Sequence, residues 1–173
     1  MGQGAAVTLR AQRIEQAGRI DLPGGALALQ ASGTAAGPAI DIGAGSTTSV
    51  AGFAVDGGAG LRVWGQAGSI TATAAAGPIQ IAGTLDASAA AGSAGGWSGG
   101  DGGRLVLRAA GDGGTLQLHT GAALLARGGS GAGAATGVAD RGGRLEVDVA
   151  TGDPAGSTPP RPDGPSLATQ LAR

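Results

Sequence analysis

The sequence predicts an all-β protein of the parallel β-helix type, a solenoid with about twenty residues in each rung. Three observations predict this fold class: aliphatic residues that recur with a fixed period, short strand-like runs that begin at glycine, and the lack of any helical pattern. A single coil of such a chain cannot bury its own apolar face. A fixed period of this length therefore indicates that successive coils stack on one another.

The period is carried by three series of aliphatic residues along the chain. The first series is Leu9, Leu29, Val50 and Ile70, and the second is Ile20, Ile40, Leu61 and Ile81. The third series, which keeps the twenty-residue step after one break in phase, is Leu85, Leu105, Leu125 and Leu145. Each series predicts a column of inward-facing side chains along the stack.

Short strands are expected wherever glycine is followed by alternating aliphatic residues. This pattern begins at Gly18, Gly25, Gly68, Gly83, Gly103, Gly114 and Gly143. In residues 103–109 the alternation puts Leu105 and Leu107 on the inner face and Arg104 and Arg108 on the outer face. Each glycine is expected at a bend that needs a positive φ or a close approach of two backbone segments. No segment keeps apolar residues at helical spacing, so helix content should be close to nil.

Two regions follow from this pattern. Residues 1–150 are predicted to form the parallel β-helix repeat region, in which 88–103 and 128–143 are glycine-rich arcs of otherwise regular rungs. Residues 151–173 are predicted to be an extended tail rich in proline and glycine, because proline cannot donate a ladder hydrogen bond.

The composition excludes several classes of protein. With 38 Gly and 8 Pro in 173 residues, an unpatterned chain would be disordered, but the net charge of −1 and the period favour an ordered stack. Without Cys, no disulfide or thiolate metal site can form, and without Lys there is no P-loop. The Arg residues are dispersed and balanced by acids, which argues against nucleic-acid binding. No apolar run is long enough to span a membrane, and no cofactor is expected.

The sharpest catalytic motif is a match to the Gly-x-Ser-x-Gly nucleophile elbow at residues 96–100, followed by Asp101, Asp112 and the single histidine, His119. The elbow needs a strand before the serine and a helix after it, and neither flank fits. His119 alternates with Leu116 and Leu118 and should therefore face outward. The Asp-Gly pairs at 56–57, 101–102 and 112–113 are read as turns rather than as calcium ligands, so no metal site is expected.

Two weaker candidate sites remain. Asp21 and Asp41 lie one predicted period apart and face outward, so they could form the stacked carboxylates of a carbohydrate-active enzyme, a polysaccharide lyase or a glycosidase. Trp97 stands in a glycine-rich stretch, where its indole could stack on a sugar ring, although such a ring more often lies flat and pins the loop.

The chain resembles the repeat region of filamentous haemagglutinin-like exoproteins. The resemblance rests on the twenty-residue period, on the segments 18–22, 24–31 and 68–74, and on the absence of Cys, and it covers about residues 4–150. These bacterial proteins leave the cell by two-partner secretion, and their long right-handed β-helix presents adhesive or toxic ends. Their amino-terminal secretion domain carries Asn-Pro-Asn-type motifs, and this chain has no Asn. The resemblance is therefore to the shaft alone, without a secretion or toxin domain.

The expected function is that of a non-enzymatic structural shaft of a secreted or cell-surface bacterial exoprotein, in adhesion or in the presentation of an effector domain. The resemblance implies an outer-membrane transporter as the partner during export, and a host-surface protein or glycan as a possible ligand. The competing hypothesis is the carbohydrate-active β-helix with Asp21 and Asp41. Because the terminal rungs of a stack carry unpaired backbone groups, the isolated chain is also expected to self-associate end to end.

Overall fold

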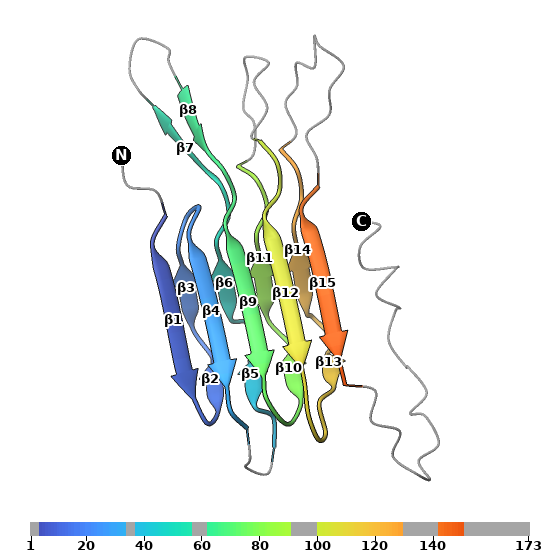
Figure 1. Cartoon of the computed structure of the whole chain (residues 1–173). Coiled ribbons are helices and arrows are strands. Elements are labelled where there is room, and N and C mark those ends of the chain that lie inside the picture. Colours follow the sequence, from blue (N-terminus) through green and yellow to red (C-terminus); the bar gives the residue numbers. More distant parts are fainter. Residues whose placement is uncertain (1–3, 34–36, 57–61, 91–99, 130–141, 151–173) are drawn as a thin grey trace.

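The structure, a computed structural model, describes residues 4–33, 37–56, 62–90, 100–129 and 142–150 (Figure 1). Within these ranges the chain forms fifteen strands and no helix. The prediction of an all-β protein is confirmed. The predicted tail at 151–173 and the candidate residue Trp97 lie outside the described residues.

Thirteen of the strands form three sheets in which every pair of neighbours is parallel. The first sheet contains β1 (Ala6–Ala11), β4 (Ala26–Ala31), β9 (Ser69–Ala74), β12 (Arg104–Ala109) and β15 (Arg144–Val149). The second sheet contains β2 (Ile14–Gln16), β5 (Ile40–Ile42), β10 (Ile79–Ile81) and β13 (Leu116–Leu118). The third sheet contains β3 (Arg19–Asp21), β6 (Thr47–Ser49), β11 (Thr84–Asp86) and β14 (Ala123–Leu125).

The chain visits the three sheets in a fixed order. It runs through a strand of the first sheet, then of the second, then of the third, and returns to the first sheet beside the strand it left. We call one such passage a circuit. Figure 1 shows the first sheet in front and the shorter strands of the other two behind it. Parallel pairing follows from this path, because each strand of a sheet is reached from the same side.

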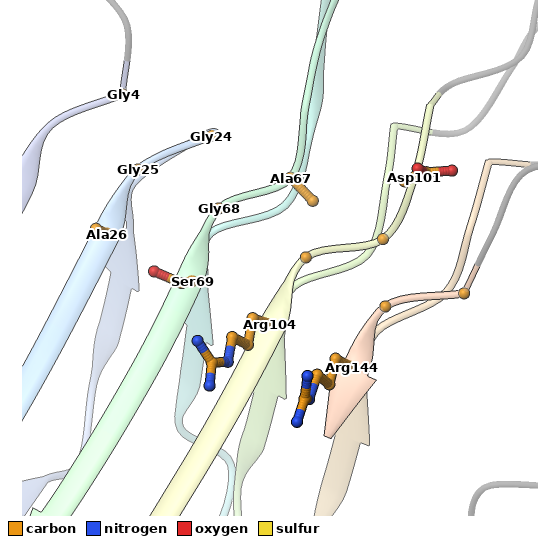
Figure 2. A pocket seen from close by; sticks show the side chains of 14 residues that line it. Gly4, Gly24, Gly25, Ala26, Ala67, Gly68, Ser69, Asp101, Arg104 and Arg144 are labelled. Atoms are coloured by element: carbon orange, nitrogen blue, oxygen red, sulfur yellow. The ribbon is translucent and has the colours of Figure 1, made fainter. Parts of the chain in front are cut away.

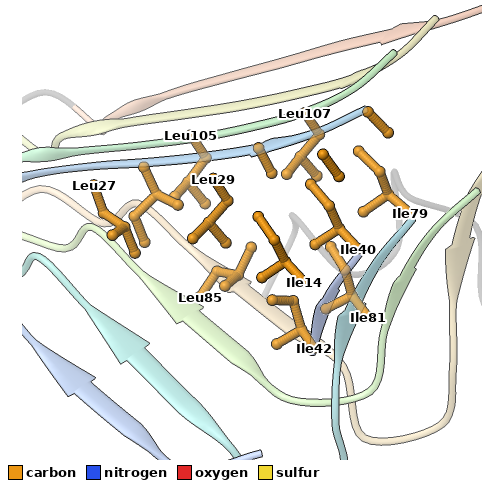
Figure 3. Close-up of a cluster of buried hydrophobic side chains, with 14 of the residues drawn as sticks. Ile14, Leu27, Leu29, Ile40, Ile42, Ile79, Ile81, Leu85, Leu105 and Leu107 are labelled. Atoms are coloured by element: carbon orange, nitrogen blue, oxygen red, sulfur yellow. The ribbon is translucent and has the colours of Figure 1, made fainter. Parts of the chain in front are cut away.

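One aliphatic core lies between the three sheets (Figure 3). In the first sheet Leu27, Ile70 and Leu105 are in register on successive strands, and each is at most 1% exposed. In the second sheet Ile40 and Ile79 form a matching column and are equally buried. Burying a Leu or Ile side chain contributes about 1.5–3 kcal/mol. These columns therefore hold the circuits together without any disulfide.

The predicted inner and outer faces of residues 103–109 are confirmed. Leu105, Leu107 and Ala109 are buried in the core, whereas Arg104 and Arg108 are exposed on the other face. The alternation of side chains along a strand is sufficient to explain this separation.

The twenty-residue rung holds only for the first circuit. Ala6 pairs with Ala26, twenty residues on, but Ala26 pairs with Ser69, Ser69 with Arg104, and Arg104 with Arg144. These later steps are 43, 35 and 40 residues long, so a rung of about twenty residues is wrong for them. The period has a different origin in the third series.

Leu85, Leu105, Leu125 and Leu145 are expected to form one column, and only Leu105 and Leu145 do so, in the first sheet. In the third sheet Leu85 is in register with Leu124, which packs against the core, whereas Leu125 is in register with Asp86. The step of twenty residues from Leu85 to Leu105 covers about half a circuit, and both side chains are buried because an aliphatic residue can point inward from either sheet. The second series is likewise divided, and its member Leu61 lies outside the described residues.

Glycines align at the start of the first sheet because the backbone approaches too closely for a side chain. Ser69 N–H donates to Gly25 O (3.0 Å), Arg104 N–H to Gly68 O (3.0 Å), and Arg144 N–H to Gly103 O (2.9 Å). A Cβ atom at Gly68 would overlap Gly25 O, and one at Gly103 would overlap Gly68 O. None of these glycines has a positive φ. Of the two reasons expected for glycine here, close approach is therefore the one that applies.

Candidate functional site

The chain returns from the third sheet to the first sheet four times, by one short and three long connections. The short connection comes first and runs from Asp21 at the end of β3 to Ala26 at the start of β4. The next three run over residues 50–68, 87–103 and 126–143, and they account for most of the extra length of the later circuits. They include the glycine-rich arcs that the sequence predicted at 88–103 and 128–143.

The outgoing ends of these connections pair with one another like strands. Val50 N–H donates to Asp86 O (2.8 Å), and Ala87 N–H donates to Leu125 O (2.7 Å). Two residues further on, Gly52 N–H donates to Ser88 O (2.8 Å) and Ala89 N–H to Arg127 O (2.8 Å). The parallel pairing of the third sheet thus continues into the connections, which places them side by side along one edge of the stack.

Each connection also closes with the same hydrogen bond. Gly68 N–H donates to Val50 O (2.8 Å), Gly103 N–H to Ala87 O (2.7 Å), and Gly143 N–H to Ala126 O (2.5 Å). The three acceptors each directly follow the last residue of β6, β11 or β14. Three successive circuits therefore open and close their long connection at equivalent points. We call this side of the molecule the connection edge.

The first long connection contains an antiparallel hairpin. Its strands β7 (Phe53–Asp56) and β8 (Arg62–Gly65) extend beyond the three sheets (Figure 1). A Cβ atom at Gly65 would overlap the ring of Phe53, and a Cβ atom at Gly24 would lie 3.1 Å from the same ring. The Phe53 ring therefore packs on bare glycine backbone at the base of the hairpin. On β8, Trp64 Nε1 is buried without a hydrogen-bond partner within the described part of the chain.

A shallow groove of about 600 Å³ runs across the strands of the first sheet where the connections return (Figure 2). Its floor is glycine backbone, and its side chains with polar groups are Ser69, Asp101, Arg104 and Arg144. Figure 2 shows the two arginines on neighbouring strands at one end of the groove.

The arginines beside the groove are held by Glu146 on β15. Arg104 Nη2 lies 2.6 Å from Glu146 Oε2, Arg108 Nη2 lies 2.7 Å from Oε1, and Arg144 Nη2 lies 3.7 Å from Oε2. Hydrogen bonds from Arg104 and then Arg108 lower the pKa of Glu146 from 4.5 to about 2. The carboxylate is thus charged at neutral pH and offsets one of the three positive charges around it.

This ion-pair cluster also explains a buried residue on the outer face. Val106 is only 4% exposed, yet it lies in register with Glu146 and outside the core cluster. Arg104 and Arg108 flank Val106 on the same strand and both reach Glu146. The salt-bridged side chains therefore cover Val106, as the aliphatic stems of arginine often do.

The structure does not bring Asp21 and Asp41 together. Asp21 lies on β3 of the third sheet in register with Ser49, and Asp41 lies on β5 of the second sheet in register with Glu15 and Gln80. The expected carboxylate stack was inferred from a twenty-residue rung, and it is wrong because the two strands belong to different sheets.

Each of these aspartates instead has an arginine neighbour. Arg19 donates to Asp21 over 2.8 Å, and Arg13 lies 3.9 Å from Asp41 and 3.7 Å from Glu15. Glu15 and Asp41 are the carboxylates that do become neighbours. Sequence reasoning missed this pair, because Asp21 follows an isoleucine just as Glu15 and Asp41 do, and this local pattern does not show which two of the three acids share a sheet.

The nucleophile-elbow match is described only in part. His119 and Asp112 are exposed, as expected for His119, and Ser98 lies outside the described residues. Gly113 has a φ of 71°, which fits the predicted turn at Asp112-Gly113. Among the described residues, no group of three or more His, Cys, Asp or Glu side chains is placed to bind a metal ion. No helix long and apolar enough to cross a membrane occurs in the same part of the chain.

Comparison of the chain with protein-family models, with curated proteins and with solved structures found no match.

Proposed function

We propose that the chain is a segment of a right-handed parallel β-helix and serves as the non-enzymatic shaft of a secreted or cell-surface bacterial exoprotein. The observation that carries this proposal is the stack itself: three parallel sheets around one aliphatic core, reached in the same order by each circuit. Right-handedness is supported by the general rule that crossovers between parallel strands have this hand. The secreted setting is supported by the resemblance of the repeats to filamentous haemagglutinin-like shafts.

The construction of the stack supports the role of a shaft. Backbone hydrogen bonds between strands run along the stacking direction, and neighbouring strands are spaced by about 4.8 Å. The absence of Cys means that no disulfide has to form after export. Such a chain can cross a membrane pore unfolded and gain its stiffness by stacking.

Display is assigned to the connection edge. Binding residues occur disproportionately on loops that a rigid scaffold positions. All three aromatic residues of the chain belong to the long connections by their sequence position: Phe53 and Trp64 to the first, and Trp97 to the second. Adhesion or effector presentation is therefore proposed to use this edge, while the outer faces of the sheets serve the shaft.

A loop-shortening experiment tests this proposal. Residues 51–67 are replaced by Pro-Gly, so that the first long connection resembles the short return through Pro23 and Gly24. The matched control is Gln80→Ala with Gln117→Ala, which removes an exposed hydrogen bond (2.8 Å) on the second sheet, away from the connection edge. Both variants and the parent chain are immobilised and exposed to a panel of surface glycans and matrix proteins.

The expected result is that the loop-shortened chain keeps a strand-type circular dichroism spectrum but loses binding, whereas the glutamine variant keeps both. Equal binding by all three proteins would contradict display at the first connection. Loss of the strand spectrum on shortening would contradict the separation of shaft and connection. Release of new reducing ends from any glycan would favour the enzymatic alternative.

A further inference from the structure

The two ends of the first sheet expose residues of the kind that the middle strands bury. The edge strands are β1 and β15. Leu9 on β1 is 41% exposed, although its register partner Leu29 is fully buried. Val147 on β15 is 38% exposed, although its partner Leu107 is 1% exposed. Among the residues that the structure describes, each end therefore presents an open column of the core and a strand edge without a neighbouring strand.

We propose that a second copy of this chain adds its β1 to β15, in parallel and in the register that the internal pairs share. Within the molecule, the glycine before each strand aligns with the glycine before the next, from Gly68 to Gly103 to Gly143. Continuing this alignment places Ala5 of the second copy beside Gly143. Leu9 of the second copy then meets Val147, so the two exposed apolar side chains cover each other.

Charges on the outer face agree with this register. Thr8 of the second copy meets Glu146, and Arg10 meets Asp148. Within the molecule, Asp148 is in register with Arg108, but the Arg108 guanidinium binds Glu146 (2.7 Å). Arg10 is held at its own position by donation from Nε to Gln30 Oε1 (2.8 Å). Opposite charges in facing positions of neighbouring strands favour pairing.

The backbone is complementary in the same register. In the internal pairs, the first residue of each strand donates its N–H to the residue before the neighbouring strand, as Arg144 does to Gly103 O. By continuation, Ala6 N–H of the second copy donates to Gly143 O. The contact uses the first sheet alone, because the other two sheets end one strand earlier, at β13 and β14. The β1 edge of one copy meets the β15 edge of the other, so each copy keeps one free edge. The assembly is therefore an open chain of copies rather than a closed dimer.

This contact requires the parallel stack but does not depend on a role in adhesion. The absence of native Cys allows a direct test of the register. One sample carries Arg10→Cys and a second carries Asp148→Cys, and the two are mixed under mild oxidation. Facing Cα atoms on neighbouring strands are about 5 Å apart, within the range that a disulfide spans. Gln117→Cys, on the exposed face of the second sheet, replaces one partner as the matched control.

The expected result is that the Arg10→Cys and Asp148→Cys chains crosslink at least about tenfold faster with each other than either does with the Gln117→Cys chain or with itself. Preferential crosslinking of Arg10→Cys chains to themselves would show an antiparallel contact of two β1 edges and would overturn the proposal. Equal rates in all mixtures would show non-specific collision and would also overturn it.

A charge exchange gives an independent test by sedimentation velocity. Arg10→Asp and Asp148→Arg should each weaken self-association by roughly fivefold, because one facing pair then carries like charges. The double variant should restore the parent behaviour. A parent chain that stays monomeric at every concentration while keeping its strand spectrum would refute the contact and leave the proposed shaft standing.

Discussion

Gly68→Ala should be among the most destabilising small substitutions in the chain. The added Cβ would overlap Gly25 O and would lie 2.7 Å from Gly25 C and 2.8 Å from Gly25 N. All three are backbone atoms, so no side chain can rotate away. Relief requires β4 and β9 to separate at this point, where Ser69 N–H donates to Gly25 O (3.0 Å).

The cost can be estimated from two contributions. Forcing an extra carbon into a packed site costs about 1–3 kcal/mol. Weakening the hydrogen bond between the strands adds about 0.5–1.5 kcal/mol. The free energy of unfolding should therefore fall by about 1.5–4.5 kcal/mol, compared with the roughly 5–15 kcal/mol of a typical domain.

Gly18→Ala is the matched control, because a Cβ atom there meets nothing within 4 Å and the φ of Gly18 is not positive. This change should be neutral or should stabilise the fold by up to about 1 kcal/mol, since alanine restricts the unfolded chain. Urea unfolding followed by far-UV circular dichroism measures both variants. If Gly68→Ala and Gly18→Ala differ by less than about 0.5 kcal/mol, close backbone approach is not the reason for the glycine alignment.

Three further predictions concern the core and the outer face. Thr48→Val should raise the free energy of unfolding by about 1 kcal/mol, which urea unfolding can measure. Thr48 Oγ1 is buried without a hydrogen-bond partner among the described residues, and Thr48 lies in register with the apolar residues Ile20 and Leu85. Leu105→Asp should lower the free energy of unfolding by about 3–5 kcal/mol, measured by thermal unfolding, because it buries an unpaired charge. Gln117→Asp, on an exposed strand face, should change it little. Equal tolerance of the two changes would contradict the assigned faces. The pKa of Glu146 is lowered in the folded state from 4.5 to about 2. The stabilising contribution of this carboxylate should therefore be complete above pH 4.5 and should be lost as the pH falls from about 4.5 to about 2. In Glu146→Gln, the free energy of unfolding measured against pH should be flatter over this range.

The faces of the strands could be predicted from the sequence, but the length of a circuit could not. Alternation along residues 103–109 depends only on local geometry, so Leu105 and Arg104 were assigned correctly. A spacing of twenty residues has two structural explanations here: one full circuit between Leu9 and Leu29, and about half a circuit between Leu85 and Leu105. Both place an aliphatic side chain inside, and hydropathy alone cannot distinguish them.

The same ambiguity in circuit length explains why the predicted carboxylate site is wrong. Asp21 and Asp41 were paired through the assumed rung, and the error in rung length placed them on different sheets. The cluster of Arg104, Arg108 and Glu146 could have been found, because the forty-residue step from Leu105 to Leu145 puts residues 104–108 beside 144–148. The closing bonds of the long connections could not, since they join backbone atoms and leave no side-chain signal at Val50, Ala87 or Ala126.

The identical closure of the long connections has a consequence for how such a chain can be altered. Successive circuits of 43, 35 and 40 residues keep the same strand register, so the length beyond each closing bond is uncoupled from the core. Doubling the length of a flexible loop costs only about 0.6 kcal/mol in closure entropy. Foreign peptides inserted between Asp56 and Arg62, at the end of the hairpin, should therefore be carried without unfolding the stack. Insertions and deletions in the long connections could therefore change the displayed peptide during evolution while the three sheets and their core stay the same.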